Sequence, residues 1–319
     1  MKKLLFLFTL FTYSFTQAQD YKQWVRKADS CYTAKNYAAS VAFYDKAFKI
    51  EKKSQTDLYN AACSAAMAKE EKKAFKWLDL AIDNGYENIA HMKIDGDLKV
   101  LQTNKEWPKM VAKLQKKLDV LEANYDKPLQ KELLDIYTDD QGIRHEFMKI
   151  YKEKGKESKS FDSINNLMGY KDSINLIKVM KILDHKGWVG ADVVGSQANQ
   201  TLFLVIQHAD LQYQQKYLPM MREAAKTGKA KPSALAYLED RVALREGRKQ
   251  IYGSQILTNP TTKKPFFAPL EDPDNVDKRR AAVGLGPLAD YAVKSNIVWN
   301  VEAYKKELPE LIELTNKKK

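Results

Sequence analysis

The chain has 319 residues, of which 44% are hydrophobic and 29% are charged. This composition excludes a wholly disordered chain, and the length favours two domains, each with its own core. The net charge is +12, but the surplus is spread over scattered lysines with no aromatic and basic recognition motif, so we expect no nucleic-acid partner.

The N-terminus has the pattern of an export signal. Lys2 and Lys3 precede an almost wholly apolar or hydroxylic run over residues 4–15, and Thr16-Gln17-Ala18 offers small residues to a signal peptidase. We predict a signal peptide over residues 1–18 and a periplasmic or secreted protein, whose net charge falls to +10 when Lys2 and Lys3 are removed. No later stretch is long and apolar enough to predict a transmembrane segment.

Residues 19–126 contain an internal repeat. The segment Phe43-Tyr44-Asp45-Lys46-Ala47-Phe48 aligns with Trp77-Leu78-Asp79-Leu80-Ala81-Ile82 at an offset of 34 residues, the tetratricopeptide period. Small and large apolar residues recur at this offset, as expected for stacked helical hairpins. The stretch resembles tetratricopeptide repeats, with Lys35 in place of the usual turn glycine. A third, degenerate unit is expected over residues 89–121.

The resemblance implies that the repeats bind a protein or peptide partner in a concave face. The alternative is that so short an array only packs against the next domain. Cys31 and Cys63 fall at interior positions of the predicted helices. Export would permit a disulfide, but we favour two buried free thiols.

Residues 127–319 are predicted to form a second, mostly helical domain that starts near Pro128, a residue suited to a first helical turn. Gln250 to Leu257 and Lys264 to Phe267 flank a turn at Asn259-Pro260 and predict a short β-hairpin. The fold class is therefore mainly α, with tetratricopeptide-like hairpins packed to this domain. Helices are expected at about 129–137, 141–154, 161–185, 197–208, 211–227, 233–245, 276–283, 287–294 and 301–314.

Candidate chemistry centres on Gln207-His208-Ala209-Asp210, because this stretch ends a helix that is apolar nearly all round. His208 is the natural general acid or base. Asp210 cannot face it along a continuous helix, since residues two apart point in different directions. Asp240, on a neighbouring helix, is the alternative carboxylate to orient His208.

Arginines and neutral polar residues complete the candidate site. Arg241, Arg279 or Arg280 could bind an anionic group of a small ligand. The further candidate ligand-binding residues are Gln207, Gln250, Tyr252, Gln255 and Arg280.

Each of these residues also has a structural interpretation. Asp210 can cap the following helix, His208 can bind a backbone carbonyl in the core, and Asp240 and Arg241 can belong to buried ion pairs. The other histidines have no metal-ligand spacing with His208, so we predict no metal and no cofactor.

An ordered series of motifs runs through the second domain. It includes Gly187-Trp188, Gln207-His208-Ala209-Asp210, Asp240-Arg241, Tyr252-Gly253-Ser254-Gln255 and Val283-Gly284-Leu285. Over roughly residues 127–304 the series resembles an uncharacterised bacterial domain family. The resemblance implies no activity.

Two functions therefore remain open. One is an exported interaction protein that binds a protein, peptide or envelope ligand. The other is a hydrolase or group-transfer enzyme on an anionic substrate, using His208 with Asp240 and Arg241. The enzyme hypothesis predicts that His208, Asp240, Arg241 and Gln255 meet around a cleft that solvent can reach.

Overall fold

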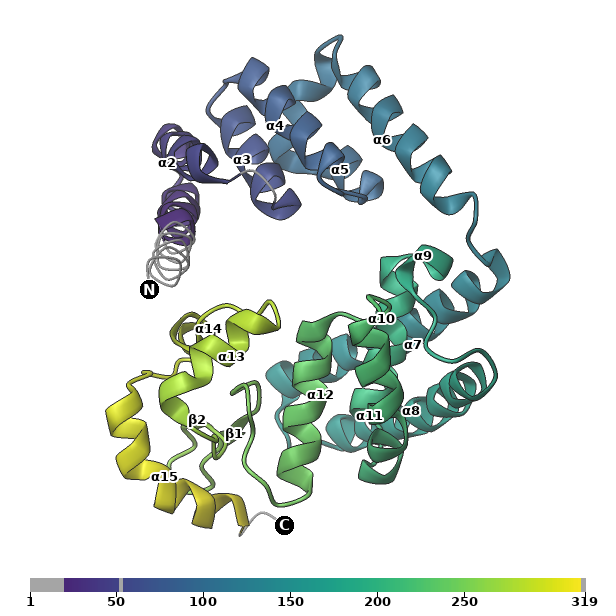
Figure 1. Ribbon diagram of the computed structural model, residues 1–319, viewed down its shortest axis with the longest axis vertical. Helices are drawn as coiled ribbons and strands as arrows, with labels where there is room; N and C mark the ends of the chain where they lie inside the picture. The colour runs from purple at the N-terminus through teal and green to yellow at the C-terminus, as the bar shows by residue number, and fades with distance from the viewer. Residues whose placement is uncertain (1–19, 52–53, 317–319) are drawn as a thin grey trace, which may run out of the picture. The chain divides into compact units, whose positions relative to one another are not determined.

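The computed structural model describes residues 20–51 and 54–316 and is mainly α-helical (Figure 1). The predicted signal peptide lies outside the described residues. The predicted mainly α fold with a short β-hairpin is confirmed, since helical hairpins dominate and the described strands form one two-stranded antiparallel sheet. In the described part of the chain, every helix is too short or too polar to cross a bilayer. Contacts divide the chain into two units, Met1–Ala123 and Asn124–Lys319.

The first unit is a series of helical hairpins. Residues 20–33 are helical, and α3 packs against both α2 and α4. Its core consists of alanines that allow close helix approach and of aromatic residues such as Tyr44 and Trp77 that fill the remaining space. The other elements are α2 (Tyr37–Ile50), α3 (Gln55–Met67), α4 (Glu71–Asp83), α5 (Ile89–Ile94), η1 (Gly96–Thr103) and α6 (Trp107–Glu122).

The offset of 34 residues is visible in the turns of this unit. Lys35 and Lys69, one offset apart, join the two helices of successive hairpins. Both have left-handed backbones, with φ of 57° and 63°. A side chain in this region is strained, because its Cβ crowds the backbone, and glycine avoids the strain. The same backbone turn therefore recurs although neither copy has the glycine.

Replacing Lys69 by glycine is expected to stabilise the first unit by up to about 1 kcal/mol, because relief of left-handed strain exceeds the entropy lost by glycine. Urea unfolding of the full chain measures the change. Lys76→Gly is the matched control, since Lys76 is exposed in the middle of α4 and the change should cost about 1 kcal/mol there. Equal destabilisation by both changes would contradict the strain.

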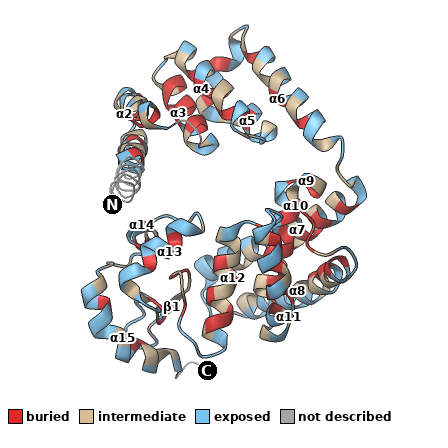
Figure 2. Cartoon of the chain, in the orientation of Figure 1, coloured by how far each residue is buried: buried red, intermediate tan, exposed pale blue. Residues whose placement is uncertain are grey.

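The second unit begins with a helical layer around α10. This helix packs against α7, α8 and α12, and most of its residues are buried, as Figure 2 shows. Ser158 caps α8 by accepting the Phe161 N–H at 3.2 Å. The helices are α7 (Lys127–Lys154), α8 (Lys159–Lys186), α9 (Ala191–Val194), α10 (Ser196–His208), α11 (Leu211–Lys226) and α12 (Pro232–Arg245).

One prediction for this layer is wrong. We expected a break between two helices near residues 138–140, whereas α7 runs unbroken from Lys127 to Lys154. The polar residues there have partners: Asp139 binds Lys171 at 2.5 Å, and Asp140 is buried against α10. Side-chain partners outside the helix therefore explain the polar run, and no break is needed.

The remainder of the second unit surrounds the β-hairpin. Strand β1 (Ile256–Thr258) pairs with β2 (Pro265–Phe267), and Gln250 makes a separate bridge to Leu270. Phe267 and Leu270 lie in a small apolar core with residues of the C-terminal helices. These are η2 (Pro273–Asn275), α13 (Val276–Ala282), α14 (Leu288–Lys294) and α15 (Val301–Asn316).

Candidate functional site

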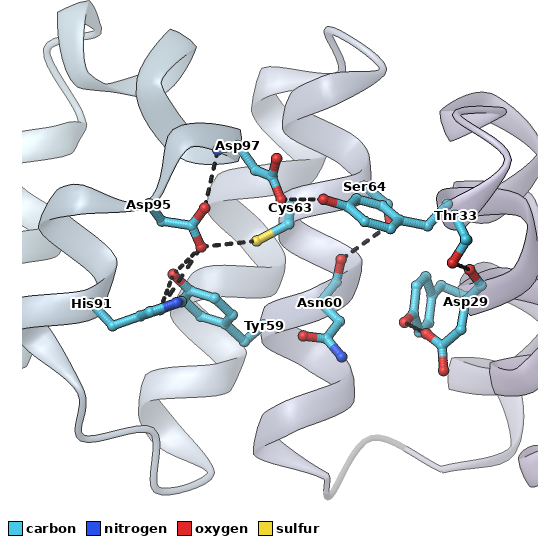
Figure 3. A pocket seen from close by; sticks show the side chains of 11 residues that line it. Asp29, Thr33, Tyr59, Asn60, Cys63, Ser64, His91, Asp95 and Asp97 are labelled. Atoms are coloured by element: carbon cyan, nitrogen blue, oxygen red, sulfur yellow. Dashed lines mark hydrogen bonds and ion pairs between the residues drawn. The ribbon is translucent and has the colours of Figure 1, made fainter. Parts of the chain in front are cut away.

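The first unit contains a cavity of about 420 Å³ on the inner side of its hairpins. Its wall comes from the 20–33 helix, α2, α3 and the α5–η1 segment (Figure 3). Among the lining residues are three carboxylates and no lysine or arginine, although the chain as a whole is strongly basic. The lining residues are Asp29, Tyr32, Thr33, Tyr44, Tyr59, Asn60, Cys63, Ser64, His91, Asp95 and Asp97.

Each carboxylate of the cavity accepts a hydrogen bond from a tyrosine. Asp95 uses both oxygens, one for the Tyr59 hydroxyl at 2.7 Å and one for the Asp97 N–H at 3.0 Å. Asp29 and Asp97 accept one hydroxyl each and keep a second oxygen that no described residue bonds. Their hydroxyl donors are Tyr44, at 2.5 Å from Asp29, and Tyr32.

The surroundings make one of these carboxylates, Asp29, costly to ionise. Burial raises the pKa of Asp29, and the nearby charge of Asp57 adds to this, while the hydrogen bond from Tyr44 opposes it. Burial also raises the pKa of Tyr86 to about 12, and it raises the pKa of Tyr59 further. The Tyr59 phenol therefore stays protonated and donates to Asp95. A cation in the cavity would offset the cost of ionising Asp29.

Cys63, Asp95 and Asp97 are close enough to hold a metal ion, since their ligand atoms all lie within 4.8 Å of one another. Burial and the charges of Asp95 and Asp97 raise the pKa of the Cys63 thiol, which favours S–H over the thiolate that soft metals need. Both oxygens of Asp95 already accept hydrogen bonds from Tyr59 and the Asp97 N–H. The group suits an organic cation better than a metal. Cys63 and Cys31 are both free thiols, Cys63 buried and Cys31 half-buried.

In the second unit, His208 is paired with a carboxylate that we did not predict. Its Nδ1 lies 3.1 Å from Oδ1 of Asp140 on α7. Asp140 is 1% exposed and also contacts Arg144 at 3.1 Å and Gln141 at 2.6 Å. Burial alone would raise the pKa of Asp140, but the hydrogen bond and charge of His208, with Arg144, lower it. Asp140, not Asp240, therefore orients His208.

Asp240 instead holds the loop that precedes β1. Its carboxylate accepts the backbone N–H groups of Ile251 at 2.6 Å, Tyr252 at 2.9 Å and Ser254 at 2.9 Å. It is fully buried, and burial raises its pKa although these hydrogen bonds lower it. Gly253 has φ of 68°, and a Cβ there would lie 3.0 Å from Leu288. The Asp240 carboxylate, from α12, thus holds this loop in place.

Three of the predicted ligand-binding residues also hold this loop. Gln250 is fully buried and bonds the backbone of Gln255 and Ala268. Arg280 is 3% exposed and donates to the carbonyls of Gly286 and Tyr252 at 2.6 and 2.7 Å. The Gln255 side chain donates to Ser254 Oγ at 3.0 Å. Their polar groups are used inside the fold.

The remaining predicted residues have fewer partners. Tyr252 donates its hydroxyl to Glu239 at 3.3 Å. Asp210 is exposed at the N-cap of α11, but its side chain makes no capping hydrogen bond. Gln207 has a buried Oε1 that no described residue bonds. Arg241 is half-buried, and its Nε is buried and makes no hydrogen bond to a described residue.

Asp140 could have been found from the sequence by its position. The buried residues of α7 are Leu129, Leu133, Ile136, Asp140 and Ile143. Asp140 stands in this helical series where an apolar residue is expected, so it needed a buried partner. The predicted break at residues 138–140 concealed the series. The cavity of the first unit had no comparable signal, because its carboxylates come from separate elements.

Comparison with known proteins identifies the second unit. Residues 127–301 match the model of a family described as "Family of unknown function (DUF6624)". No curated protein and no solved structure matches the chain. The matched residues make up more than half of the chain and include Asp140, His208, Asp240 and Arg280. The chain therefore belongs to the DUF6624 family of unknown function.

Proposed function

We propose that the protein is an exported interaction module whose first unit, a tetratricopeptide-like array, binds a cationic group of a peptide or protein partner. The observation that carries the proposal is a cavity whose described lining residues include three carboxylates and no lysine or arginine. Its wall comes mainly from the first helix of each hairpin, the side on which a stacked array presents its concave face.

The arrangement of the carboxylates suits an ammonium or guanidinium group. Asn60 lies between Asp29 and Asp97 in Figure 3, and each of the two carboxylates has an oxygen with no described partner. A lysine, an arginine or a free amino terminus can donate to such oxygens, and charge-assisted hydrogen bonds are the stronger kind. The tyrosines hold the carboxylates in place through their hydroxyls, and their rings offer aromatic faces to a cation.

The expected result is that the full chain binds pentapeptides with a central lysine at least tenfold more tightly than the same peptides with Nε-acetyl-lysine. Acetylation keeps the side-chain length and removes only the charge. Fluorescence anisotropy of a randomised library with that one fixed position measures the ratio. The double change Asp29→Asn and Asp97→Asn should abolish the preference for lysine over acetyl-lysine peptides.

Asp83→Asn is the matched control, because Asp83 is an exposed carboxylate of the same unit paired with Lys113. It removes a charge away from the cavity and should leave binding unchanged. The double variant should stay folded, since burial already disfavours the ionised form of Asp29. Equal affinity for both libraries, or equal loss in the Asp83 variant, would refute the proposal.

The second candidate function is a hydrolase or group-transfer enzyme in the family domain. It is favoured by the pairing of His208 with Asp140, which uses Nδ1 and leaves Nε2 with no bond to a described residue. A buried carboxylate that orients a histidine in this way prepares the other nitrogen to accept a proton. In this candidate Asp140 replaces Asp240 as the orienting carboxylate. An enzyme of this kind also needs a cation for the anionic group of its substrate.

A further inference from the structure

Arg241 on α12 has no counter-ion among the described residues. No described residue gives its guanidinium a hydrogen bond or an ion pair, and its Nε is buried. Burial lowers its pKa, and the positive charges of Arg245 and Arg144 lower it further. The charges that lower the pKa of Arg241 are thus those of two more guanidinium groups.

The two neighbouring arginines add positive charge near Arg241 and supply no counter-charge. Arg144 is committed to Asp140 at 3.1 Å and to Asp172 at 2.9 Å. Arg245 donates to the carbonyl of Ala209 at 2.7 Å, directly after His208. It stands one helical turn from Arg241, and like charges four residues apart repel. A half-buried charge without a partner is unfavourable, so this arrangement favours an anion from solution.

The other candidate arginines differ from Arg241 in this respect. Arg279 contacts Asp272 and the carbonyls of Ile251, Glu271 and Asp272. Arg280 is bound to two carbonyls and stacks over Tyr291, with its guanidinium carbon 5.3 Å from the ring centre. Of the three arginines that could bind an anionic group, only Arg241 has its donors unused.

We propose that Arg241, with Arg245 one turn away, forms a binding site for a small oxyanion, either a phosphate or a carboxylate group. A guanidinium offers paired donors that match the oxygens of these groups. Arg241 is half-buried, so a small solute can reach it. Arg245 connects the site to the backbone beside His208. The inference deepens the second candidate function and is independent of peptide binding by the first unit.

Thermal unfolding of the full chain tests the site, with inorganic phosphate or acetate titrated against chloride at constant ionic strength. At a concentration ten times the dissociation constant, the ligand should raise the folding equilibrium constant about elevenfold, a shift of a few degrees. A response to phosphate alone assigns the site to phosphate groups, and a response to acetate as well assigns it to oxyanions generally.

Arg241→Gln should lose the response, whereas Arg248→Gln should keep it, because Arg248 is exposed and pairs with Glu246. Without phosphate or acetate, the Arg241→Gln protein should be at least as stable as the wild type, since an uncompensated charge is gone. Arg245→Gln should weaken the response and provides a second variant. The proposal would be overturned if phosphate or acetate stabilised the Arg241→Gln protein as much as the wild type. It would also be overturned if Arg241→Gln lowered stability in the absence of both anions.

Discussion

Replacing Asp240 by alanine is expected to destabilise the family domain by about 3–5 kcal/mol. The change leaves the N–H groups of Ile251, Tyr252 and Ser254 without their acceptor in a buried loop. Each buried donor left without a partner costs about 1–3 kcal/mol, and partial relaxation of the loop reduces the sum. Urea unfolding of the full chain, followed by circular dichroism, measures the loss.

Two further variants separate this role from a catalytic one. Asp240→Asn keeps one acceptor and removes the buried charge, so it should cost less than alanine. Asp210→Ala should change stability by no more than about 0.5 kcal/mol, because Asp210 is exposed and its side chain makes no capping bond. If Asp240→Ala proved as mild as Asp210→Ala, the carboxylate would not hold the loop.

Asp140→Asn is expected to destabilise the same domain by about 2–4 kcal/mol at pH 7, because it removes the charge that compensates Arg144 and orients His208. The pKa of Asp140 is lowered in the folded protein. Its stabilisation is therefore fully present above the ordinary aspartate pKa of about 3.9 and disappears as the pH falls through the folded value. Unfolding measured at pH 7 and again below pH 4 should show the difference between variant and wild type shrinking.

Asp139→Asn is the control for this change. Asp139 is adjacent to Asp140 but half-exposed, and its ion pair with Lys171 should contribute at most about 1 kcal/mol. A loss in Asp139→Asn as large as that in Asp140→Asn would show that the effect belongs to the surface charge of α7. It would then have nothing to do with the buried pair.

Most of the fold could be predicted because its signals are local. The turn at Asn259-Pro260 between the two strands depends on residues close together in the chain, and the 34-residue offset is read directly from the sequence. The break predicted in α7 failed for the opposite reason. Asp139 and Asp140 are stabilised by Lys171 and His208, which lie far along the chain on other helices.

The candidate site was harder to predict because neighbours in sequence need not share a face. Asp240 and Arg241 are consecutive, but consecutive side chains of a helix point about 100° apart. Asp240 therefore meets the loop before β1, whereas Arg241 lies near Arg144 of α7. The sequence predicted that both residues belong to one site. The packing of α12 instead gives each residue a different set of neighbours.

The loop bound by Asp240 has one more consequence. Three backbone N–H groups that converge on a carboxylate resemble the backbone nests that bind free anions in other proteins. Here the anion is tethered to the same chain, so its effective concentration exceeds that of any solute and the nest is always saturated. No residue in the described part of the chain is such a tethered partner for Arg241. The composition of the surrounding solution should therefore govern occupancy at Arg241 and leave the loop unaffected.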